Sequence, residues 1–226
     1  MKKVALLLFT VYYLLFTIPA FAQSVDILWQ GETYTPPFFE GLPLWSRQSQ
    51  ITFAAVTDGL PNSEGLVYNW IRNGTVLGLV SGVGINSLSF SDTIFSKPIT
   101  VGVEVLNKNE ELLAENEITL VPVEPMIVVY ENHPLYGFLF NQGMVGQYNM
   151  GKDETTLAAF PLYFSGIVGL KYVWKSNAGE PEYQSMVTYR APEDAAGTAS
   201  ISVDVSHNYF LRQVAKTSFL IEFGKK

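Results

Sequence analysis

Apolar and polar residues alternate along much of the chain with a period of two. In the segment 100–105 (TVGVEV) three valines alternate with small or polar residues, and 200–205 (SISVDV) has the same order. Such alternation is typical of strands with one buried and one solvated face. The segment 112–117 could form a helix, but its position after a hairpin turn predicts a strand. Turn-forming residues separate the predicted strands at Asp58-Gly59, Asn73-Gly74, Asn107-Lys108-Asn109 and Ser206-His207-Asn208.

The pattern occurs twice. Residues 65–70 (GLVYNW) recur as 169–174 (GLKYVW), with Gly, Leu, Tyr and Trp at identical spacing and an offset of 104 residues. The apolar segment 51–55 parallels 156–160 upstream, and 100–105 parallels 200–205 downstream at an offset of 100. The repeat predicts two copies of one domain, with Trp70 and Trp174 as equivalent core residues.

A short proline-containing segment divides the two copies. Pro122 and Pro125 deny hydrogen bonds to a sheet and stiffen the backbone, which is typical of a linker. We therefore expect domain 1 over residues 23–121, a linker over 122–125 and domain 2 over 126–226. Domains of about 100 residues are usual for antiparallel sandwiches.

The first 22 residues have the features of a signal peptide. Lys2 and Lys3 precede the uncharged apolar run 4–18, and Ala20-Phe21-Ala22 matches a small-x-small cleavage site. Cleavage would leave Gln23 as the mature N-terminus, with no transmembrane span. The alternative is an uncleaved N-terminal anchor, although a span needs about 20 apolar residues. The expected location is secreted, periplasmic or cell-surface.

Composition narrows the classes of partner. Without Lys2 and Lys3 the chain has 12 basic and 21 acidic residues, a net charge of −9, which argues against a nucleic-acid partner and against adhesion to anionic lipid. The chain has no cysteine, so disulfides, thiol catalysis and thiolate metal sites are excluded. Stability must come from the burial of apolar side chains.

Two motifs resemble immunoglobulin-like domains. The Tyr68-x-Trp70 strand followed by the Asn73-Gly74 turn is similar to the family's strand C, and 193–201 is similar to the corner before strand F. Ala199 stands in the tyrosine position of that corner and Ile201 in the cysteine position. Residues 99–120 are similar to the last two strands of PKD-type domains of bacterial surface proteins. The resemblance implies an all-β fold of two tandem antiparallel immunoglobulin-like β-sandwich domains.

No catalytic, cofactor or metal constellation emerges from the sequence. His133 and His207 are too few and too far apart for a triad or a zinc site, and we expect both to be solvated turn residues. No D-x-D-x-D-G calcium motif occurs, although a calcium site involving Asp58, Asp92 or Asp194 remains an alternative. We expect no catalytic residue, no metal and no cofactor.

The segment 34–45 (YTPPFFEGLPLW) combines aromatic residues with prolines, and 133–140 (HPLYGFLF) is its shorter counterpart. One interpretation is an edge strand interrupted by prolines and packed under the sandwich. The other is an exposed apolar surface that recognises a partner. On the second interpretation the possible partner-binding residues are Phe38, Phe39, Trp45 and Tyr136.

These expectations favour a non-enzymatic binding or scaffold protein, secreted or in the cell envelope, built of two immunoglobulin-like modules. The expected partner is another envelope or extracellular protein, or a glycan. The alternative function is an accessory carbohydrate-binding protein that acts with a separate glycoside hydrolase. That function requires exposed, coplanar aromatic side chains on one sheet face.

Overall fold

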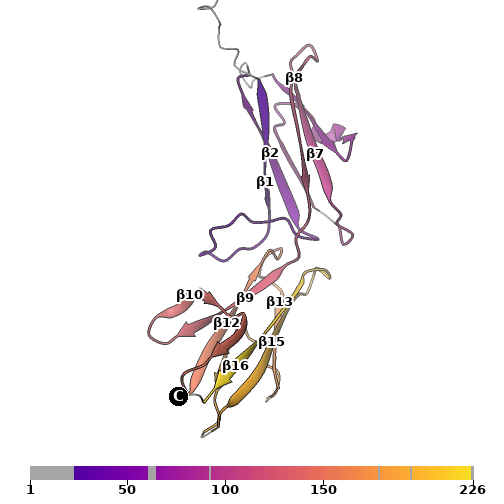
Figure 1. Ribbon diagram of the computed structural model, residues 1–226. Helices are drawn as coiled ribbons and strands as arrows, with labels where there is room; N and C mark the ends of the chain where they lie inside the picture. Colours follow the sequence, from indigo (N-terminus) through magenta and orange to yellow (C-terminus); the bar gives the residue numbers. More distant parts are fainter. Residues whose placement is uncertain (1–22, 61–64, 92, 178, 194, 225–226) are drawn as a thin grey trace, which may run out of the picture.

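The computed structural model describes residues 23–60, 65–91, 93–177, 179–193 and 195–224. The predicted signal peptide, together with Asp92 and Asp194, lies outside them. The described chain is built of β-strands and one short 3₁₀ turn, η1 (Gly78–Val80). Figure 1 shows two sandwiches one after the other along the chain. The all-β expectation is confirmed.

The N-terminal sandwich consists of two facing sheets. One has the order β1-β2-β6, and the other has the order β4-β3-β7-β8 with β5 paired to β3. With β1 as strand A, this is the A-B-E and C-F-G arrangement of immunoglobulin-like domains. The strands are β1 (Ser24–Gly31), β2 (Gln50–Asp58), β3 (Val67–Arg72), β4 (Thr75–Val76), β5 (Gly82–Val83), β6 (Ser87–Ser91), β7 (Ile99–Leu106) and β8 (Leu112–Leu120).

The C-terminal sandwich repeats the A-B-E and C-F-G arrangement, with two additional strands and without counterparts of β4 and β5. Its sheets have the orders β10-β9-β12-β14 and β11-β16-β15-β13. The additional strands are β10, which forms a hairpin with β9, and β11, which pairs in parallel with β16. The strands are β9 (Met126–His133), β10 (Gly137–Gly143), β11 (Gly146–Asn149), β12 (Glu154–Leu162), β13 (Leu170–Ser176), β14 (Met186–Arg190), β15 (Gly197–His207) and β16 (Val214–Phe223).

Each sandwich encloses its own apolar core, and the repeated tryptophans lie at equivalent places. Trp70 and Trp174 are buried in separate clusters, opposite Val103 and Val203 on the neighbouring strands. Trp70 Nε1 donates to the Ile85 carbonyl at 2.9 Å, and Trp174 Nε1 donates to the Gln184 carbonyl at 2.8 Å. The repeat seen in the sequence is therefore a repeat of core contacts.

The predicted strands agree with the structure, as do the predicted turns except the one at 206–208, where Ser206 and His207 are the last residues of β15. The segment 112–117 lies in β8, and the valines of 100–105 face the core from β7. Asn73 and Gly74 both have positive φ, 49° and 77°, as the tight hairpin turn between β3 and β4 requires. The Asn73 side chain accepts a bond from the Thr100 amide, and Asn177 accepts the equivalent bond from Ser200.

The aromatic–proline segment is not an edge strand of the N-terminal sandwich. It belongs to the long connection between β1 and β2, residues 32–49, which has only isolated bridges to Phe164 and Val123. In Figure 1 this connection extends from the lower end of the N-terminal sandwich towards β10 and β12. We call residues 32–49 the junction loop.

Candidate functional site

The junction loop joins the C-terminal sandwich through backbone hydrogen bonds. The Tyr34 amide donates to the Phe164 carbonyl at 2.6 Å, and the Tyr163 amide donates to the Tyr34 carbonyl at 2.8 Å. Phe164 is fully buried in the C-terminal core. The loop is therefore paired with a segment whose side chain is part of the C-terminal core.

Phe38 occupies an aromatic cluster on the C-terminal sandwich. Its ring stacks on Phe140 at a centroid distance of 3.8 Å and meets the edges of Tyr130 at 5.9 Å and Phe160 at 5.0 Å. Phe138 completes the cluster through Phe140 and Phe160. Tyr130 and Phe160 come from β9 and β12, whereas Phe38 comes from the junction loop. We call these five residues the aromatic cluster.

The four residues proposed from the sequence as a partner surface do not lie together. Phe38 and Phe39 both contact the C-terminal sandwich, Phe39 through the edge of Tyr163 at 6.1 Å. Trp45 is instead 1% exposed and packs in the N-terminal core. Its side chain therefore offers no surface to a partner. Tyr136 is 76% exposed at the β9–β10 turn, where its ring stacks on His133.

A polar network connects the base of the junction loop to two loops of the C-terminal sandwich. Gln213 is fully buried; its Nε2 donates to the Arg47 carbonyl at 3.0 Å, and its Oε1 accepts a bond from the Ser165 amide at 2.7 Å. Gln48 Oε1 accepts a bond from the Arg212 amide at 2.8 Å. Buried amide groups satisfied in this way fix the relative position of the loops that they join.

The segment after β8 contacts the same loop. The Val123 amide donates to the Trp45 carbonyl at 2.9 Å, and Arg47 forms an ion pair with Glu124 at 2.9 Å. The predicted linker is therefore held against the junction loop. The covalent linker and the junction loop thus meet where the sandwiches join.

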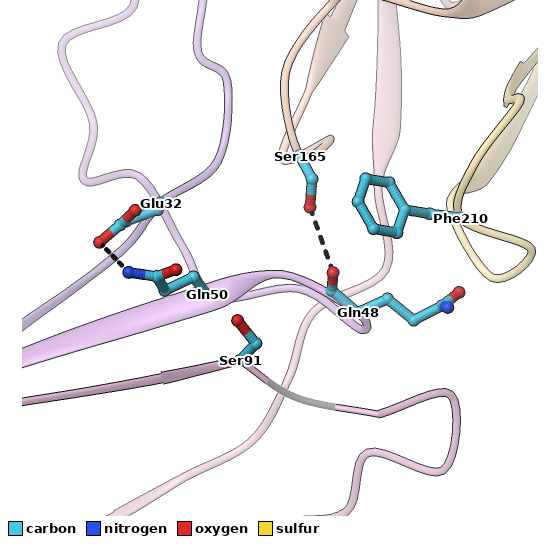
Figure 2. Close-up of a pocket in the computed structure, with 6 residues that line it drawn as sticks. All are labelled: Glu32, Gln48, Gln50, Ser91, Ser165 and Phe210. Atoms are coloured by element: carbon cyan, nitrogen blue, oxygen red, sulfur yellow. Dashed lines mark hydrogen bonds between the residues drawn. The ribbon is translucent and has the colours of Figure 1, made fainter.

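A cleft of about 350 Å³ opens at this junction. Figure 2 shows side chains from both sandwiches around it, with the Phe210 ring beside Ser165 and Gln48. The Glu32 carboxylate accepts a bond from Gln50 Nε2 at 2.8 Å, and Ser91 lies nearby at the end of β6. The lining residues are Glu32, Gln48, Gln50, Ser91, Ser165 and Phe210.

A buried carboxylate lies elsewhere, within the C-terminal sandwich. Burial raises the pKa of Glu131, but hydrogen bonds from Lys152 and Tyr148 outweigh it, and the pKa is lowered overall. Tyr148 donates at 2.5 Å, and burial together with this bond raises the pKa of Tyr148 to about 12. Through these bonds the Glu131 carboxylate connects β9 to β11 and to the loop that follows β11. This role is structural.

One of the two histidines, His207, is less exposed than the sequence predicted. His133 is part of the β9–β10 hairpin, but His207 is buried at the end of β15, and burial lowers its pKa. The expectation of a solvated His207 was wrong because Phe210 packs on its ring. Within the described ranges no three metal-ligating side chains come close enough to hold an ion, and no helix is long and apolar enough to cross a membrane.

Several residues of the junction had no signal in the sequence. Gln48, Gln213 and Phe210 are single polar or aromatic residues in loops, and no motif or spacing distinguishes them. The positive φ of Gln48, 61°, is uncommon for a residue other than glycine, but it is visible only in the structure.

Comparison with known proteins gives similarities of fold only. No family model matches the chain, and no curated protein matches it. Fibronectin(III)-like modules of CbhA from Clostridium thermocellum have a TM-score of 0.28 and 11% identity, covering 84% of this chain and 93% of that one.

Two further solved structures are of the same kind. A putative membrane-anchored protein from Corynebacterium diphtheriae has a TM-score of 0.31 and 11% identity, covering 92% of this chain and 60% of that one. Sidekick-1 immunoglobulin domains 1–4 have a TM-score of 0.26 and 12% identity, covering 84% and 74%. The immunoglobulin-like assignment of this chain rests on its own strand order.

Proposed function

We propose that the protein is a non-enzymatic binding or scaffold protein, secreted or in the cell envelope, whose two immunoglobulin-like domains act as one rigid unit. The proposed domains are residues 23–121 and 126–226, joined by a linker over 122–125. The observation that carries the proposal is the junction loop, which packs the half-buried Phe38 ring against Tyr130, Phe140 and Phe160 of the other sandwich.

The physical argument is one of conformational entropy. Domains joined by a mobile linker lose orientational freedom when a partner binds both, and this loss weakens binding. A junction ordered beforehand removes that cost. The backbone pairing at Tyr34 and the buried Gln213 amide hold the two sandwiches together without any partner. A surface formed by both sandwiches would therefore be preorganised.

The proposed location outside the cytoplasm rests on the first 22 residues, with Gln23 as the mature N-terminus. The charged start, the apolar run and the Ala20-Phe21-Ala22 site support it. Intact mass of the protein recovered from its host tests this step, and retention of Met1 would favour an anchored protein.

Affinity capture from envelope and culture-supernatant fractions tests the proposed function. The baits are the wild type, Phe38→Ala and the matched control Tyr183→Ala, which removes an aromatic ring that is 69% exposed. We expect one partner to be enriched by the wild type and the control and reduced with Phe38→Ala. The absence of any specific partner would contradict the binding function. Equal capture by all three baits would contradict the requirement for a rigid junction.

A further inference from the structure

The junction cleft has walls from both sandwiches. Glu32, Gln50 and Ser91 come from the N-terminal side, and Ser165 and Phe210 come from two loops of the C-terminal side (Figure 2). Its volume of about 350 Å³ lies within the range of small-molecule sites, roughly 300–1,000 Å³. The cleft exists only where the sandwiches meet, so its ligand would contact both.

The N-terminal wall presents oriented hydrogen-bonding groups. Glu32 Oε1 accepts bonds from Gln50 Nε2 and from Thr52 Oγ1, each at 2.8 Å. Both bonds orient the Glu32 carboxylate, and both go to Oε1. Neither of them occupies Glu32 Oε2. Gln50 Oε1 and the Ser91 hydroxyl add an acceptor and a group that can both donate and accept.

The opposite wall supplies an aromatic ring and a second hydroxyl. Phe210 is half-buried, and His207 packs on it at a centroid distance of 4.7 Å, which supports its orientation. Ser165 Oγ lies beside the ring in Figure 2 and donates to the Gln48 carbonyl at 3.4 Å. The carboxylate of Glu32, the amide of Gln50 and the hydroxyl of Ser91 thus face an aromatic ring and a hydroxyl across the cleft.

Backbone strain occurs at the same place. Gln48 has a φ of 61°, in the left-handed region that residues other than glycine rarely adopt. Its side chain and its carbonyl are both held by the C-terminal sandwich, through the Arg212 amide and Ser165 Oγ. Residues held in such conformations concentrate at ligand sites. The two hydrogen bonds hold this strained residue at the edge of the cleft.

We propose that this cleft binds a saccharide. Neighbouring hydroxyl groups of a sugar can each donate to a carboxylate or amide oxygen and accept from an amide or hydroxyl, and the apolar C–H face of the ring can pack on Phe210. A phosphorylated or carboxylated ligand fits poorly because Glu32 and the net charge of −9 of the cleaved chain oppose an anion. The inference rests on the proposed function, since both walls must stay together.

An NMR titration of the purified, ¹⁵N-labelled protein tests the site. The probes are four neutral disaccharides at millimolar concentration: maltose, cellobiose, lactose and N,N′-diacetylchitobiose. We expect at least one to shift, saturably, the side-chain amides of Gln48 and Gln50 and the backbone amide of Arg212. Glycylglycine, which offers an ammonium group to Glu32, is titrated in parallel.

The variants Phe210→Ala, Glu32→Gln and Ser91→Ala should each weaken binding of the active sugar, by roughly tenfold for the first two. Ser91 is exposed, so its variant keeps the test valid if Phe210→Ala fails to fold. The matched controls Tyr183→Ala and Glu180→Gln, exposed and outside the cleft lining, should bind as the wild type does.

Three results would overturn the saccharide site. The first is that none of the four sugars shifts the amide signals of the cleft residues. The second is that glycylglycine alone shifts them, and the third is that Ser91→Ala and Glu32→Gln bind the sugar as tightly as the control Glu180→Gln. A negative titration on a protein whose sandwiches hold one fixed distance would remove this inference only. A protein whose inter-sandwich distance varies widely would instead remove the proposed function on which it rests.

Discussion

Trp70 and Trp174 show what the sequence repeat means for a single side chain. Each indole is buried, and each Nε1 donates to a carbonyl in the segment that precedes the next strand of the facing sheet. The bond matters because a buried donor without a partner costs free energy of its own. Each position therefore uses both the volume of the indole and its single donor.

Replacing either tryptophan with alanine should lower the free energy of unfolding by about 3–5 kcal/mol, because a large cavity forms in the core. Chemical denaturation of Trp70→Ala and Trp174→Ala measures this loss, with Tyr183→Ala as the exposed aromatic control. A loss below about 1 kcal/mol at either tryptophan would show that the side chain is not part of the packed core.

The Glu131 carboxylate predicts a dependence on pH. Its pKa in the folded protein lies below the ordinary value of 4.5, so the unfolded chain binds more protons in acid. The stabilisation is present above pH 4.5 and is lost as the pH falls through the folded-state pKa. Denaturation midpoints of the wild type and Glu131→Gln, measured from pH 7 down to pH 3, should converge in acid. Parallel curves would contradict the role given to this carboxylate.

At the scale of elements, the strands could be predicted and the junction loop could not. Alternation identifies strands such as β7 and β15 because their two faces meet different environments. The conformation of the junction loop depends on contacts with residues more than 90 positions later in the sequence, such as Tyr130. A local sequence pattern does not encode such contacts. The prolines and aromatic residues of 34–45 indicated an unusual segment. Ring contacts with the other sandwich give Phe38 its role, and burial in the N-terminal core gives Trp45 its role.

Phe38→Ala should loosen the junction loop while leaving both sandwiches folded, because Phe38 belongs to an irregular segment and not to either core. Stacked and edge-on aromatic pairs contribute about 0.5–1.5 kcal/mol each beyond the area that they bury. Hydrogen exchange at the Tyr34 and Tyr163 amides, which bond across the junction, should therefore accelerate by roughly tenfold or more.

Tyr136→Ala is the matched control for this exchange experiment, since Tyr136 is 76% exposed at a hairpin turn away from the Tyr34–Phe164 pairing. Its exchange rates at Tyr34 and Tyr163 should equal those of the wild type. Unchanged exchange in Phe38→Ala would show that the backbone pairing holds the loop without the aromatic cluster.

At the scale of the whole molecule, the junction distinguishes this chain from two sandwiches on a free linker. Interfaces between consecutive domains are usually small and permit relative motion. Here an inserted aromatic ring, a backbone pairing and a buried glutamine act at one junction. The binding function and the saccharide site both depend on this junction holding one geometry.

The most direct test is the distribution of distances between spin labels on the two sandwiches. The chain has no cysteine, so Glu115→Cys on β8 and Ser218→Cys on β16, both exposed, allow labelling at two unique positions. Pulsed electron–electron double resonance should give one narrow distance distribution, which broadens when Phe38→Ala is added. A broad distribution in the otherwise unaltered protein would contradict the rigid unit.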